Sequence, residues 1–381
     1  MTLGGVMDWQ ALRSDFAITR NYNYQNHAAI APMCRRAVEA AKRQLDHSYE
    51  NAYLGGGFSR RAEHVRQRAA DLINARPDEI CFVKNTTEGL SFVANGLKWQ
   101  RGDNVVTTNV EFPANMYPWM ALQDRGVELQ IVIEENGRVP LDRVIESVNA
   151  RTRVVAISAV QYASGFRTDL AALGEYCASR GVLLCVDAIQ ALGAFPIDVK
   201  AMNIDFLSAG SHKWLCGPQG LGTFYVRKEV QGLLQPTTVG YMSMKNPTLY
   251  DKYHFEFQDS ARRYDSGGYN TTGIFALGGA LEMIHEIGVD AIATRLTHLT
   301  DILVEGLRSR GYQVISSRRP GESSGIVAFT SDYHDHNQLQ MHLEKEHRLV
   351  IAHRAGRLRA SPHFYTSQRE IEQLVELLPA H

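Results

Sequence analysis

The chain has 381 residues, of which 44% are hydrophobic and 21% are charged, as in a folded protein of enzyme size. Its 40 basic and 41 acidic residues give a net charge of −1, which argues against a nucleic-acid-binding surface and against a basic membrane patch. Residues 1–16 carry no signal-peptide pattern, no apolar run reaches membrane-spanning length, and the five cysteines form no CxxC pair. We therefore expect a cytoplasmic protein with reduced cysteines.

Strand-like and helix-like stretches alternate between residues 79 and 227. Short apolar runs predict strands, and helical spacing fills several gaps between them, as at 88–97 and 169–179. This alternation predicts an α/β domain whose central sheet is mostly parallel and covered by helices on both faces. The predicted strands are 80–83, 104–107, 128–133, 154–158, 182–186, 206–207 and 223–226.

Beyond residue 245 the pattern changes to that of a smaller α+β domain. Residues 246–272 are polar, aromatic and irregular. The elements predicted after them are helices at 278–287, 290–310 and 337–346, strands at 313–316, 326–330 and 349–352, and a last helix that follows the capping-box sequence Ser367-Gln-Arg-Glu370. We expect an N-terminal segment at 1–20, a large α/β domain at 21–245, an interface segment at 246–275 and a small C-terminal domain at 276–381.

The segment 205–222 holds a lysine in an unusual place. A short apolar strand runs into small residues and delivers Ser211, His212 and Lys213 just before a Gly/Pro turn. A lysine there can be desolvated and kept partly neutral, so its amine becomes nucleophilic toward an aldehyde, as a Schiff-base lysine must be. The alternative is an ordinary loop lysine with its ammonium in water.

The strand before it ends in a carboxylate, Asp187. A charged carboxylate at the end of a buried strand is unfavourable in free energy unless a positively charged group pairs with it. It could hold a ring nitrogen protonated, so that the ring withdraws electrons, or it could only cap the next helix. Asp187 and Lys213 follow successive strands, and the carboxyl ends of such strands gather at one edge of the sheet. One site could therefore take both.

Three further segments could contribute to that site. Thr86 and Thr87 begin a helix whose free N–H groups could bind an anion, or they could serve only as caps. Phe112 could give a flat cofactor an aromatic face, or belong to the core. The run 353–361 holds three arginines, one of which could clamp a substrate carboxylate while the others lie on a solvated surface.

Motifs of other enzyme classes are missing from the sequence. No G-x-G-x-x-G follows a strand, which argues against a dinucleotide-binding domain. No HExxH motif or Cys/His cluster indicates a metal, and no G-x-S-x-G indicates a hydrolase.

Together these segments resemble the class V aminotransferase family of fold-type I pyridoxal-phosphate enzymes, over about residues 20–378. The resemblance implies that Lys213 carries pyridoxal 5'-phosphate, that Asp187 pairs with its pyridine nitrogen and that Gln190 contacts its ring hydroxyl. It implies that an amino-acid substrate is held through its carboxylate by Arg359. The residues that would contact the phosphate are Thr86, Thr87, Ser211 and His212.

The segment 263–270 resembles the part of this family that crosses a dimer interface. Gly268 stands there where a threonine is common, so its backbone N–H would reach the phosphate in the partner subunit. The resemblance therefore implies a homodimer with shared active sites.

Two departures from the family bear on the reaction. Cysteine desulfurases place a histidine over the ring, whereas Phe112 can stack there but cannot transfer a proton. They also carry a nucleophilic cysteine shortly before the clamp arginine, and residues 349–359 contain none. The segments 111–115 and 164–169 resemble the branch of isopenicillin N epimerase-like and C–S lyase-like proteins. We expect an aminotransferase-type reaction at Cα of an amino acid, with a β-eliminating C–S lyase or an epimerase as alternatives, ahead of a cysteine desulfurase or a cofactor-binding scaffold without activity.

Overall fold

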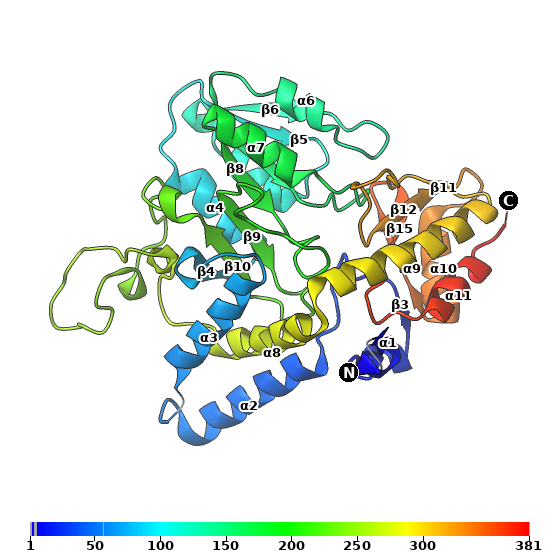
Figure 1. Ribbon diagram of the computed structural model, residues 1–381, viewed down its shortest axis with the longest axis horizontal. Helices are drawn as coiled ribbons and strands as arrows, with labels where there is room; N and C mark the ends of the chain where they lie inside the picture. The colour runs from blue at the N-terminus through cyan, green and yellow to red at the C-terminus, as the bar shows by residue number, and fades with distance from the viewer. Residues whose placement is uncertain (1, 4–5, 56, 381) are drawn as a thin grey trace.

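A seven-stranded sheet forms the centre of the computed structural model, which describes residues 2–3, 6–55 and 57–380 (Figure 1). Its strand order is β4-β10-β9-β8-β7-β5-β6, and the pairs from β9 to β6 are parallel. β10 runs antiparallel to both of its neighbours. The strands are β4 (Ile80–Val83), β5 (Asn104–Thr108), β6 (Glu128–Val132), β7 (Thr152–Ser158), β8 (Leu183–Asp187), β9 (Phe206–Gly210) and β10 (Gly222–Val226). The predicted mostly parallel sheet is confirmed.

Helices bury both faces of this sheet, because the strand side chains alternate between two apolar cores. Val154 and Ala156 of β7 lie in the core under α4 (Thr86–Gly96), and Val155 and Ile157 lie in the opposite core. The helices on that second face are α2 (Arg35–Asn51), α3 (Phe58–Asp71), α7 (Leu170–Arg180) and α8 (Thr271–Ile287). The small residues 208–210 are also buried, so β9 continues three residues past its predicted end.

A second sheet with its own apolar core lies toward the C-terminal end of the chain, on the right of Figure 1. Its order is β11-β12-β15-β14, and all its pairs are antiparallel. The elements here are β11 (Gln313–Val314), β12 (Val327–Thr330), β14 (Ala352–Arg354), β15 (Arg357–Ala360), α9 (Val289–Ser309), α10 (His336–His347) and α11 (Gln368–Leu377). The expected α+β character of this part is confirmed.

The predicted strand 349–352 is wrong as a single element. β13 (Leu349–Val350) pairs in parallel with β3 (Asn23–Tyr24), near the start of the chain, and β14 begins only at Ala352. An apolar run indicates extended backbone but does not identify its partner strand.

The division into segments at residues 20, 245 and 275 stays a prediction. The structure packs α8 against α2 and α3, at the large sheet. A Cβ at Gly279 of α8 would lie 2.6 Å from the carbonyl oxygen of Arg36, so this close approach requires glycine.

In the described part of the chain, no helix combines the length and apolarity needed to cross a membrane. The remaining elements are short. They are β1 (Thr2–Leu3), β2 (Val6–Met7), α1 (Trp9–Arg13), α5 (Tyr117–Met120) and α6 (Leu141–Glu146), with 3-10 turns at Ala17–Arg20, Pro77–Glu79, Pro113–Asn115, Gln123–Arg125, Lys228–Val230, Tyr241–Ser243 and Ala261–Tyr264.

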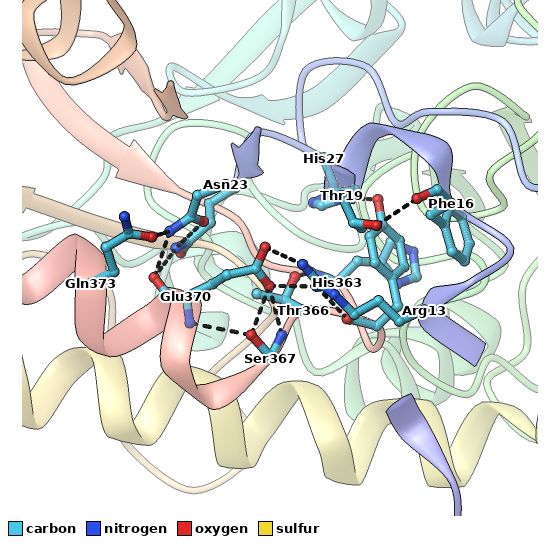
Figure 2. A network of polar contacts seen from close by, with 12 residues as sticks. Arg13, Phe16, Thr19, Asn23, His27, His363, Thr366, Ser367, Glu370 and Gln373 are labelled. Atoms are coloured by element: carbon cyan, nitrogen blue, oxygen red, sulfur yellow. Dashed lines mark hydrogen bonds and ion pairs between the residues drawn. The ribbon is translucent and has the colours of Figure 1, made fainter. Parts of the chain in front are cut away.

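The N-terminal segment is fastened to the start of α11 (Figure 2). Arg13 donates two hydrogen bonds to the carboxylate of Glu370, at 2.5 and 2.6 Å. Glu370 also accepts the backbone N–H of Ser367 at 2.8 Å, which confirms the predicted capping box. Asn23 donates to the carbonyl oxygen of Glu370 at 2.8 Å. One carboxylate therefore caps the last helix and anchors the beginning of the chain.

We expect Arg13→Gln to lower the free energy of unfolding by roughly 1–3 kcal/mol, because it leaves a mostly buried carboxylate without its charged partner. Urea denaturation followed by circular dichroism measures this. The matched control is Arg369→Gln, which breaks an exposed ion pair with Glu376 on the same helix and should change the free energy by less than about 1 kcal/mol. Equal effects of the two substitutions would contradict the anchoring role.

Candidate active site

Two of the predicted site residues, Asp187 and Lys213, lie at the carboxyl edge of the large sheet. β8 ends at Asp187, whose neighbour in register on β9 is Ser208, and Lys213 follows the end of β9 by three residues. The turn after Lys213 is closed by a hydrogen bond from the backbone N–H of Cys216 to the carbonyl oxygen of Lys213, at 2.9 Å. Lys213 is only 8% exposed. The sheet therefore delivers an amine and a carboxylate to one buried place.

The surroundings of Lys213 favour a neutral amine. Burial lowers the pKa of Lys213; the charge of Asp187 opposes this, and the guanidiniums of Arg359 and Arg354 lower it further. The Nζ atom lies 5.6 Å from the ring centroid of Phe112, which is 44% exposed. The ring predicted to stack on a cofactor is thus beside the predicted cofactor lysine.

Asp187 is a buried carboxylate at the end of β8. It accepts the N–H of Ile189 at 3.0 Å, and the positive charge of Lys213 acts on it. Burial raises its pKa, and the nearby charge of Glu111 adds to this. A protonated ring nitrogen would supply a positive charge, so this residue fits the predicted cofactor.

Of the three arginines in 353–361, Arg359 is the buried one. Its Nη1 donates to the carbonyl oxygen of Tyr162 at 2.7 Å, its Nη2 donates to Oδ1 of Asn26 at 3.4 Å, and its Nε has no partner among the described residues. Burial, and then the charge of Arg354, lower its pKa to about 10. Arg357 instead pairs with Glu134. A buried guanidinium with an unused donor suits the carboxylate of a substrate.

The residues predicted to bind phosphate lie around the same strand ends. Thr86 is buried at the start of α4 and accepts the N–H of Gly210 at 3.0 Å through its hydroxyl, whereas Thr87 is exposed. The Ser211 hydroxyl donates to carbonyl oxygens within its own turn, and His212 is half-buried. Their phosphate contacts stay predictions.

Gln190 and Gly268 occupy different surroundings. Gln190 donates to the carbonyl oxygen of Ala28 and accepts the indole N–H of Trp214, each at 2.9 Å, so it connects the N-terminal segment to the lysine loop. Gly268 lines a cavity of about 270 Å³ beside Lys84. Its reach into a partner subunit stays a prediction.

The sequence interpretation did not single out several residues that shape this site. Asn26 and Tyr162 hold Arg359, and Glu111 accepts hydrogen bonds from two loops. Glu111 could have been found from its place directly after a strand at the same sheet edge as Asp187. The sequence carries no comparable signal for Tyr162, since it contributes only a backbone carbonyl to Arg359.

Comparison with known proteins agrees with this geometry. The family model described as aminotransferase class V matches residues 23–374, and the chain belongs to this family. The chain is 29% identical to a probable cysteine desulfurase from Methanothermobacter thermautotrophicus, with 98% of each protein covered. Its structure is similar to the apo structure of a cysteine desulfurase from Thermococcus onnurineus NA1, with a TM-score of 0.88 and 26% identity over 96% of each chain.

A second similar structure is that of a C-DES variant with glycine covalently linked to its PLP cofactor. Its TM-score is 0.90, at 22% identity over 97% of this chain and 98% of that one. The predicted fold-type I architecture is therefore confirmed, and the protein is a pyridoxal-phosphate-dependent enzyme. Because the relatives include named cysteine desulfurases, the comparisons do not support the expectation that the chain stands apart from that branch.

We expect Lys213 to become reactive at a lower pH than an ordinary lysine, whose pKa is about 10.4. Burial lowers its pKa, so the neutral amine forms earlier as the pH rises. The rate at which cofactor-free protein takes up pyridoxal 5'-phosphate, followed by visible absorbance, measures this. Arg359→Gln should move the midpoint upward because it removes a neighbouring positive charge, and Arg357→Gln should leave it in place. A native midpoint at the ordinary lysine value would contradict this interpretation.

Proposed function

We propose that the protein catalyses an aminotransferase-type reaction at Cα of an amino acid. The observation that carries the proposal is that three buried side chains, Lys213, Asp187 and Arg359, lie close enough together for the charges of Asp187 and Arg359 to act on the lysine. Nε of Arg359 also has no partner among the described residues. Bound pyridoxal phosphate supplies an aldehyde for the lysine amine and a ring that withdraws electrons from Cα.

Each of these side chains has a separate task in the proposed reaction. Arg359 holds the substrate carboxylate and so fixes the position of Cα. Lys213 would remove the proton from Cα and return it elsewhere as general base and acid. Asp187 would hold a proton on the ring nitrogen of a bound cofactor. Phe112 would offer the cofactor ring an aromatic face without a group that exchanges protons.

The hairpin before Arg359 supports a reaction without a protein persulfide. Arg354 pairs with Arg357 in register, so β14 and β15 are joined by the two residues Ala355 and Gly356, at φ 49° and 74°. Such a two-residue turn has no room for a loop that carries a thiol toward the substrate. The five cysteines are all buried, and Sγ of Cys216 lies 3.5 Å from Nε2 of His363. Burial raises the pKa of the Cys216 thiol well above its usual range, which disfavours the reactive thiolate.

A β-eliminating C–S lyase is the second candidate. The relatives named cysteine desulfurases, by that name, take sulfur from cysteine, and this chain belongs to the same family. Residues 349–359 of this chain contain no cysteine. A sulfur amino acid bound by Arg359 would then lose its β-substituent directly. An epimerase has no specific observation in its favour.

We also propose that the protein works as a homodimer in which the segment 246–275 contacts the second subunit. Tyr250, Tyr253 and Phe255 are 72%, 105% and 76% exposed there, although aromatic side chains are normally covered. This supports the predicted role of Gly268 in the partner's phosphate site and the predicted interface segment.

The product formed from a panel of amino acids tests the reaction type. With pyridoxal phosphate bound and a keto acid present as amino acceptor, we expect each accepted amino acid to yield its keto acid, measured by chromatography. Pyruvate, ammonia and a sulfur product from cysteine or cystine would favour the lyase instead. A persulfide trapped on the protein by alkylation and found by mass spectrometry would contradict both candidates.

Two substitutions test the assigned roles. Lys213→Ala should leave no bond between protein and cofactor that borohydride can reduce, measured by intact mass, whereas Lys200→Ala, at an exposed lysine, should retain that bond. Asp187→Asn should still bind the cofactor but lose about two orders of magnitude in kcat or more, because the ring nitrogen is no longer held protonated. Normal turnover by Asp187→Asn would refute the role of this carboxylate.

A further inference from the structure

We propose that Glu111 is a positioning residue of this site, whose buried carboxylate places a second negative charge behind Asp187 and fastens the loops that carry Phe112 and Tyr162. The inference rests on the proposed function, because it concerns the same lysine and carboxylate. It adds a group that contacts neither substrate nor cofactor and acts through its neighbours.

The hydrogen bonds of Glu111 favour an ionised carboxylate. Glu111 follows β5 and is 6% exposed. Its Oε1 accepts the backbone N–H of Ser158 and the amide N–H of Gln161, each at 2.8 Å. Its Oε2 accepts the Ser158 hydroxyl and the amide of Asn115, the latter at 2.9 Å. Four donors satisfy both oxygens. Burial raises the pKa of Glu111, and these hydrogen bonds oppose that shift because they stabilise the ionised form.

Ser158 brings this charge close to Asp187. Ser158 is the register neighbour of Asp187 on the adjacent parallel strand, and the N–H of Ala159 donates to the carbonyl oxygen of Asp187 at 2.9 Å. Paired residues on neighbouring strands point to the same face of a sheet at about 5 Å. The Glu111 carboxylate, bonded to Ser158, is therefore close enough to act on Asp187, whose pKa is raised first by burial and further by this charge.

The carboxylate of Glu111 adds a negative charge to a site in which two guanidiniums act on Lys213. The charge of Asp187 raises the pKa of Lys213, whereas the guanidiniums of Arg359 and Arg354 lower it. His212 is next to Lys213 in sequence, and the lysine charge lowers the pKa of that histidine. A second buried anion offsets one of these guanidiniums. It raises the proton affinity of every group in the cluster, including the lysine nitrogen and a ring nitrogen held by Asp187.

The same carboxylate fixes the two loops that shape the site. Glu111, Asn115 and Trp119 form a chain of hydrogen bonds along one turn, in which the buried indole N–H donates to Asn115 at 3.0 Å. Phe112 projects from this turn toward Lys213, and its ring contacts that of Tyr162 edge-on at 5.2 Å. Gln161, bonded to Glu111, immediately precedes Tyr162, whose carbonyl receives Arg359.

The test separates the charge of Glu111 from its structural bonds. The visible absorbance of the cofactor bound to Lys213 changes with pH, and its midpoint reports the proton affinity of the lysine nitrogen. Glu111→Gln keeps the shape and removes the charge, and should lower this midpoint by about half a pH unit or more. Glu111→Asp keeps the charge, and Gln161→Met removes one donor while the charge stays, so both should remain near the native midpoint.

A double variant that moves the charge from residue 111 to residue 115, called the exchange variant, provides a second test in case Glu111→Gln alone does not fold. Glu111→Gln combined with Asn115→Asp keeps the hydrogen bond and the net charge but moves the charge one step away from Asp187, and should lower the midpoint by less than Glu111→Gln does. A Glu111→Gln midpoint equal to the native one, or matched by Gln161→Met, would overturn the proposal. If Glu111→Gln binds no cofactor, the exchange variant decides, and a native midpoint in it overturns the proposal.

The readout needs only bound cofactor and not turnover. A protein that binds pyridoxal phosphate but converts no amino acid would contradict the proposed function, and the midpoints would still decide for or against Glu111. The two failures are therefore distinguishable.

Discussion

Asp187 and Lys213 are an acidic and a basic group buried together at the carboxyl edge of one sheet, and much of the remaining structure serves to hold them there. Neither group is stable as a buried ion without compensation. The parallel strands β8 and β9 place Asp187 beside Ser208, and Lys213 follows the end of β9 by three residues. The helices on both faces exclude water from the sheet beneath them. The electrostatic coupling between the two groups, and with Arg359, then follows from their placement.

The lysine loop is held by contacts from both ends of the chain. His363 accepts the N–H of Phe364 at Nδ1, so its Nε2 carries the proton and donates to the carbonyl oxygen of Trp214 at 3.1 Å. The indole of Trp214 donates to Gln190, and Gln190 donates to Ala28 near the start of the chain. The ion pair between Arg13 and Glu370 and the pairing of β3 with β13 join the same two ends. The position of the amine therefore depends on segments more than 300 residues apart in sequence.

This distribution explains which features the sequence revealed. Lys213 and Asp187 were predictable, because each lies at or just after the end of an apolar strand. The mostly parallel sheet was also predictable, because strand-like and helix-like stretches alternate along the sequence. Arg359 could not be separated from Arg354 and Arg357 by burial, since that depends on the β14–β15 hairpin and on Glu134 from a distant strand. The position of Glu111 after β5 was visible in the sequence, but its surroundings were not, because most of its donors lie near residues 158–161. Local pattern reveals residues at strand ends, and long-range pairing decides what surrounds them.

The short connection between β14 and β15 bears on how a sulfur-containing substrate could react. If Arg359 holds the substrate carboxylate, as proposed, a protein thiol that accepts sulfur would have to reach the substrate from a segment close to Arg359. Here the corresponding chain consists of Ala355 and Gly356, so a methyl group is the largest side chain that the turn can offer. Sulfur released from such a substrate would have to leave with its own electron pair or with an external acceptor. This turn is consistent with the proposed function, in which Lys213 moves the proton at Cα and a C–S bond would be cleaved only by an elimination that the same amine begins.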